Sequence, residues 1–204
     1  MLRVNLSSLW SDDTSNIIKG VSEAIENLKT YRESPYHTPD MLLKLGEDIR
    51  EVCCFWTGST YVGSPKRQEI KSVFQSFFDE LMTLLLAMND SKLDFEKKVA
   101  NDILYRGVVY RYLGHDCSTD KVVVPDYDNI YVSWNKEEEN SYLLSKLYGP
   151  VTKITCVIAE PLYGIDLEIL ECCRGTEREV VFPTIERYIT EVKYLGSENE
   201  TGIE

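Results

Sequence analysis

The hydrophobic period of the chain changes near Ile103, and no other feature constrains the fold as strongly. Before this residue, apolar side chains recur at intervals of three and four residues, as on one face of an α-helix. After it, apolar and polar side chains alternate, as in strands that bury one face. The sequence therefore predicts an α+β protein with a helical N-terminal half and a sheet in the C-terminal half.

Four helices are predicted in the first half. The first follows the possible N-caps Asp13, Thr14 and Ser15, and the second begins at Thr38-Pro39-Asp40, a cap followed by a proline. The third begins at Ser64-Pro65, and a shorter fourth helix covers roughly residues 93–101. The third helix has a wide apolar stripe, which is typical of a helix in the core.

Strands dominate the second half, although one helix is predicted over residues 136–147. Asn135 can cap this helix, and Glu138 follows three residues later, as in a capping box. The strands are predicted at residues 103–110, 121–124, 129–134, 153–159, 165–170, 179–182 and 188–194.

The chain is divided at the sequence level into three parts. Residues 1–100 form a helical region, residues 101–196 form the strand-rich core, and residues 197–204 are a polar, acidic tail. No flexible linker marks the boundary near residue 100, so the first two parts can belong to one domain.

The composition argues against several classes of protein. The formal net charge is -12 and the pI is near 4.7, which opposes broad affinity for nucleic-acid phosphates. No apolar run approaches the ~20 residues that a membrane-spanning helix needs, so no membrane partner is expected. The first residues lack the apolar stretch of a secretory signal, and we expect a cytoplasmic protein.

The cysteines do not indicate a metal site. Six cysteines occur without any Cys-x-x-Cys spacing, and only His37 and His115 could join them as ligands. Adjacent cysteines such as Cys53-Cys54 rarely form a disulfide with each other. We therefore expect no bound metal and reduced thiols.

Two glutamates one residue apart, Glu177 and Glu179, precede a Val-Val-Phe run that ends at Pro183. Residues i and i+2 of a strand share a face, so the two carboxylates would project side by side. Such a pair suits chemistry in which positive charge develops, for example cleavage of a glycosidic bond. The alternative is a solvated strand edge whose charges prevent edge-to-edge pairing.

Two further motifs precede this pair in the chain. In Leu104-Tyr105-Arg106-Gly107, the arginine offers a planar fork suited to a diphosphate, and the glycine lets a ligand approach the backbone. An exposed arginine in a salt bridge is the alternative interpretation. In Tyr131-Val132-Ser133-Trp134-Asn135-Lys136, a hydroxyl and aromatic side chains lie at a predicted strand end.

This ordered set resembles the mono-ADP-ribosyltransferases of the arginine-serine-glutamate type, which use NAD as donor. The family pattern has an aromatic-Arg-Gly strand, a Ser-x-Ser strand that leads into a helix, and a Glu-x-Glu-Val strand that ends at a proline. The resemblance covers roughly residues 103–195. The chain looks most similar to the small ADP-ribosyltransferases of T-even bacteriophages, whose length and helical N-terminal half are comparable. The resemblance implies a mixed, split β-sandwich with NAD in a cleft.

The resemblance also implies roles for individual residues. Arg106 would hold the NAD phosphates, with Tyr105 and Gly107 beside it. Glu179 would bind the 2'-hydroxyl of the nicotinamide ribose, and Glu177 would orient the acceptor and take its proton. Ser133 would bond toward Glu179 or the ribose, and Trp134 would line the site. The first serine of the family falls on Tyr131 here, which could stack on nicotinamide instead.

Three functions remain open at this level. The first is transfer of ADP-ribose from NAD to an arginine of a target protein, which the presence of Glu177 favours. The second is ADP-ribosylation of a nucleic acid, or hydrolysis of NAD. The third is a catalytically inactive binding module with the same fold. This alternative is motivated by Tyr131, which stands where the family has its first serine. A bacterial toxin, a phage factor acting in an infected host cell, and a defence enzyme are all compatible settings.

Overall fold

The computed structural model describes residues 13–58, 67–114, 130–138, 151–173 and 178–195. The chain divides into two compact units. The first unit comprises Met1–Leu104 together with Ile169–Arg174, and the second comprises Tyr105–Glu168 together with Gly175–Glu204. The described α-helices all lie in the first unit, and the described strand residues other than Leu104 lie in the second, which confirms the predicted α+β class.

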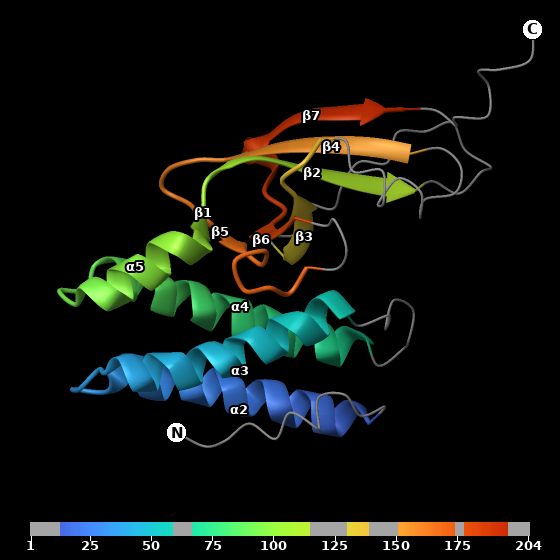
Figure 1. Cartoon of the computed structure of the whole chain (residues 1–204). Coiled ribbons are helices and arrows are strands. Elements are labelled where there is room, and N and C mark those ends of the chain that lie inside the picture. Colours follow the sequence, from blue (N-terminus) through green and yellow to red (C-terminus); the bar gives the residue numbers. More distant parts are fainter. Residues whose placement is uncertain (1–12, 59–66, 115–129, 139–150, 174–177, 196–204) are drawn as a thin grey trace, which may run out of the picture. The chain divides into compact units, whose positions relative to one another are not determined.

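Four helices are described in the first unit: α2 (Thr14–Glu33), α3 (Pro39–Gly58), α4 (Arg67–Asn89) and α5 (Asp94–Ile103). These helices confirm the four predicted from the apolar period, and Figure 1 shows α2, α3 and α4 stacked with their axes roughly aligned. Two predicted caps are present. The Asp13 carboxylate accepts a hydrogen bond from the Ser15 N–H (2.9 Å), and Thr38 Oγ1 accepts one from the Met41 N–H (3.3 Å). The predicted start at Ser64-Pro65 lies outside the described residues.

The segment Ile169–Arg174 belongs to the helical unit although strands flank it in sequence. Cys172 is 4% exposed, and its Sγ lies 3.1 Å from Cys54 Sγ on α3. Thr57 Oγ1 donates a hydrogen bond to the Cys172 carbonyl (2.8 Å). A buried thiol and a satisfied carbonyl therefore attach this short segment to α3.

The second unit is built on a seven-stranded sheet with the order β1-β5-β6-β3-β2-β4-β7. Figure 1 shows β2, β4 and β7 side by side, consistent with this order. A 3₁₀ turn, Glu186–Tyr188, precedes the last strand. The strands are β1 (Leu104–Tyr105), β2 (Gly107–Gly114), β3 (Tyr131–Asn135), β4 (Val151–Ile158), β5 (Gly164–Asp166), β6 (Glu179–Pro183) and β7 (Ile189–Tyr194).

The described strand pairings with a residue register are all antiparallel. One face of the sheet forms an apolar core that includes Val109, Trp134, Ile154 and Phe182. Because side chains alternate along a strand, Ser133 and Asn135 lie on the opposite face of β3 from Trp134. The mixed, split sandwich of the ADP-ribosyltransferase type stays a prediction.

Several predicted boundaries are wrong. Ile103 ends α5 instead of starting a strand, and Arg106 separates β1 from β2. The strand predicted at 165–170 ends at Asp166, because the Asp166 carboxylate accepts a hydrogen bond from the Glu168 N–H (3.0 Å) and turns the chain. The last strand begins at Ile189, after the 3₁₀ turn.

Two predicted elements lie largely outside the described residues. Residues 121–124 are not described. Of the helix predicted at 136–147 only residues 136–138 are described, with bends at 136 and 138 and no helix. Among the described residues, no helix is long and apolar enough to cross a membrane.

Candidate active site

Strands β3 and β6 bring Ser133 and Glu179 into contact. Ser133 Oγ donates a hydrogen bond to Glu179 Oε1 over 2.6 Å. In the antiparallel ladder Glu179 lies opposite Asn135, so Ser133 is its diagonal neighbour on the same face. The short distance is typical of a hydroxyl bonded to a carboxylate, and it fixes the orientation of that carboxylate. The contact expected between these two residues is present, while their roles stay predictions.

Arg106 contacts a backbone carbonyl and an aromatic ring, and none of its described contacts is with an acidic side chain. Its Nε donates to the Leu162 carbonyl (3.2 Å), and its guanidinium lies 3.9 Å from the centre of the Tyr163 ring. The side chain is exposed, and none of the described carboxylates forms an ion pair with it. Its outer nitrogens can therefore bind an anion with the planar fork already oriented. Arg106 contacts Leu162 and Tyr163, not the Ser133–Glu179 pair.

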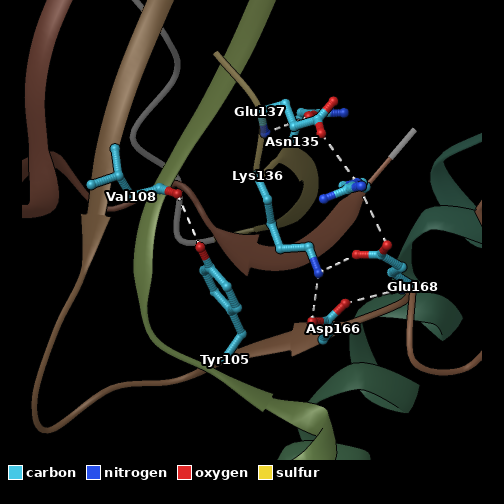
Figure 2. A network of polar contacts seen from close by, with 8 residues as sticks. Tyr105, Val108, Asn135, Lys136, Glu137, Asp166 and Glu168 are labelled. Carbon is cyan, nitrogen blue, oxygen red and sulfur yellow. Dashed lines mark hydrogen bonds and ion pairs between the residues drawn. The ribbon is translucent and has the colours of Figure 1, made fainter. Parts of the chain in front are cut away.

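Gly107 is required by the backbone next to Arg106. Its φ is +151°, and a Cβ at this position would lie 2.6 Å from the Tyr105 hydroxyl oxygen. The Tyr105 hydroxyl donates to the Val108 carbonyl (3.2 Å), as Figure 2 shows, and burial raises the pKa of Tyr105. Tyr105 and Gly107 therefore shape the chain that presents Arg106.

Lys136, just after β3, is the centre of a polar network that the sequence did not indicate. Its Nζ lies 2.8 Å from Asp166 Oδ2 and 2.5 Å from Glu168 Oε2, and Figure 2 shows it between the two carboxylates. Burial acts to lower the pKa of Lys136, but the hydrogen bonds to both carboxylates outweigh it and raise the pKa. The bond from Lys136 in turn lowers the pKa of Glu168.

Backbone hydrogen bonds beside this network hold the chain where β6 begins. The Lys136 N–H donates to the Arg178 carbonyl (2.9 Å), and the Leu167 N–H donates to the Glu179 carbonyl (2.9 Å). The Arg178 side chain lies 3.2 Å from Glu137 and 3.6 Å from Glu168. Two neighbouring segments thus hold the backbone of Glu179, so the direction of its side chain is well defined.

The other predicted site residues differ in their exposure. The Trp134 indole is 1% exposed and donates to the Phe182 carbonyl (2.9 Å), so it is part of the core and has no surface on which to bind a nucleotide. Tyr131 is half-buried opposite Pro183. Glu177 lies outside the described residues.

Comparisons with models of protein families, with curated proteins and with solved structures found no match to the chain. The described arrangement offers an oriented carboxylate, which can stabilise developing positive charge, and an exposed arginine, which can bind a phosphate. A carboxylate and an arginine of these kinds suit cleavage of a phosphate-containing glycoside.

Proposed function

We propose that the chain is an NAD-dependent mono-ADP-ribosyltransferase that transfers ADP-ribose to an arginine of a target protein and releases nicotinamide. The Ser133–Glu179 hydrogen bond is the observation that carries the proposal. It joins the second and third motifs of the resemblance through two neighbouring strands, although 46 residues separate them in the chain.

The proposed chemistry gives each group a physical task. The bond between nicotinamide and the anomeric carbon of the ribose breaks, and its electron pair leaves with nicotinamide. Positive charge develops on the ribose, and the Glu179 carboxylate stabilises it most strongly in the transition state. Ser133 keeps that carboxylate oriented, while Arg106 binds the diphosphate bidentately.

The acceptor requires a second carboxylate. A guanidinium is charged in water and has no lone pair to offer, so a base must take a proton as its nitrogen bonds to the ribose carbon. The proposal gives this task to Glu177. Water needs less help at such a centre, so loss of Glu177 should abolish transfer to protein and leave hydrolysis of NAD.

Two readouts on the same preparation test the proposal: nicotinamide released from NAD, and labelled ADP-ribose attached to protein in a bacterial lysate. Glu179→Gln should lower both by ~10² or more. A matched control is Glu191→Gln, which alters a carboxylate on β7 that contacts Lys153 and Thr155. It should leave both activities unchanged.

Glu177→Ala should lose the label on protein and keep nicotinamide release. If wild type releases nicotinamide without labelling protein, it is an NAD hydrolase or modifies a nucleic acid, and labelling of added RNA and DNA separates the two. If the wild-type chain releases no nicotinamide under any of these conditions, the proposal is wrong and a non-catalytic binding module remains.

A further inference from the structure

Asn135, the last residue of β3, has a buried side-chain amide of which only the oxygen forms a described hydrogen bond. The residue is 2% exposed, and its Oδ1 accepts a hydrogen bond from the Glu137 N–H (2.7 Å). In the described part of the chain its Nδ2 is buried and has no acceptor. A buried donor without a partner costs free energy, and native proteins rarely keep one without a reason.

The orientation of this amide is not ambiguous. The Glu137 N–H needs an acceptor, so the atom that faces it must be the oxygen. Exchanging the two atoms would set two donors against each other. The unsatisfied atom of Asn135 is therefore a donor, and what it lacks is an oxygen acceptor.

The position of Asn135 shows which ligand could supply that oxygen. In the ladder between β3 and β6 it lies directly opposite Glu179, and it shares its face of β3 with Ser133. Side chains directly opposite each other have Cβ atoms about 4.5–5.5 Å apart. Glu179 is half-buried, so part of this residue is open to solvent, while the amide nitrogen of Asn135 is buried.

We propose that Asn135 Nδ2 is a substrate-binding donor for a hydroxyl of the nicotinamide ribose of NAD. This inference rests on the proposed function, in which Glu179 acts on the same ribose. An ionised carboxylate only accepts hydrogen bonds, an amide NH₂ only donates them, and a hydroxyl does both. The two neighbouring hydroxyls of a ribose therefore complement Glu179 and Asn135 together.

Binding of three ligands to the full chain tests the assignment. ADP-ribose keeps the ribose and lacks nicotinamide, and AMP lacks that ribose altogether. Asn135→Ser is neutral and keeps an oxygen that can accept from the Glu137 N–H, but it removes the amide donor. We expect calorimetry to show affinity for ADP-ribose falling ~10-fold and affinity for AMP unchanged. The KM for NAD should rise by a similar factor.

A structural role predicts a different pattern. The Asn135 donor has no partner among the described residues, so Asn135→Ser should not lower the melting temperature. The matched control is Asn27→Ser on α2, because Asn27 is also 2% exposed but its Nδ2 donates to Asp48 Oδ2 (2.8 Å). This control should melt at a lower temperature and keep its affinity for ADP-ribose. Asn135→Asp keeps the acceptor for Glu137 and replaces the donor with an acceptor, so it should weaken ADP-ribose binding further.

Several outcomes would overturn the assignment. Unchanged ADP-ribose affinity in both Asn135 variants would do so, and so would failure of both variants to fold. A rise in the KM for NAD with normal ADP-ribose binding would place the acceptor on nicotinamide. Equal losses for AMP and ADP-ribose would place it in the adenosine half. If wild type cleaves NAD and the variants behave normally, only this inference fails. If wild type neither cleaves NAD nor binds ADP-ribose, the proposed function fails with it.

Discussion

Replacing Ser133 by alanine tests whether an oriented carboxylate drives the reaction. The substitution removes one oxygen atom and leaves the strand intact, so its main effect is loss of the 2.6 Å hydrogen bond to Glu179. A hydrogen bond to a charged group contributes about 1.5–3 kcal/mol, and this one is short and partly buried, which limits screening by solvent. Since 1.36 kcal/mol corresponds to a factor of ten in rate, turnover should fall about 10- to 100-fold.

Nicotinamide release under saturating NAD is the assay, with two companion variants. Ser133→Thr keeps the hydroxyl on a residue that strands tolerate well, and it should recover most of the turnover. The control is Thr155→Ala, which removes a hydroxyl that lies 3.4 Å from the Glu191 carboxylate on strands β4 and β7. This variant should not change turnover. Turnover of Ser133→Ala within about twofold of wild type would refute the assigned role, because the hydrogen bond would then contribute almost nothing.

Three further predictions concern the described residues around the site. Arg106→Lys should weaken ADP-ribose binding by about tenfold in calorimetry, because lysine cannot form the bidentate phosphate contact; unchanged affinity would make Arg106 structural. Gly107→Ala should lower the free energy of unfolding in denaturant by about 1–3 kcal/mol, because φ is +151° and the added Cβ would clash. Gly46→Ala in α3 should raise it by about 0.5–1 kcal/mol, because the added Cβ meets open space. Lys136 lowers the pKa of Glu168, so the stability from this pair is present above the ordinary carboxyl pKa and is lost as the pH falls through the lowered pKa. The loss of unfolding free energy caused by Lys136→Met should therefore be larger at pH 7 than at pH 3. An equal loss at the two pH values would exclude the linkage.

The helices follow from the sequence because each depends on local features. A cap such as Asp13 and a continuous apolar stripe are both visible within a short window, and α2, α3 and α5 lie close to where they were predicted. The strand ends are less predictable. Leu167 and Ile169 continue the apolar pattern beyond β5, but the Asp166 side chain bonds the backbone and turns it. Such local competition is invisible to periodicity.

The site shows the same division between local and distant information. The rule that alternate strand residues share a face places Ser133 and Asn135 together, and the motif order of the resemblance suggested Glu179 as a partner of Ser133. Lys136 and Asp166 are 30 residues apart, and their contact depends on β5, β6 and β3 being neighbours. No periodicity gives that strand order. The contact between Arg106 and Tyr163 was missed for the same reason.

The interleaving of the two units limits how the protein can be dissected. The chain passes from the helical unit to the strand unit after Leu104, returns to it for Ile169–Arg174, and leaves it again five residues before Glu179. A fragment beginning at Tyr105 would keep this short segment but lose α3, exposing the buried Cys172 thiol and leaving its carbonyl without the Thr57 hydroxyl. The loosened stretch would be the one that leads directly into β6. Domain truncation, deletion mapping and fusion at residue 104 would therefore test the integrity of the strand unit as much as the function of the helices.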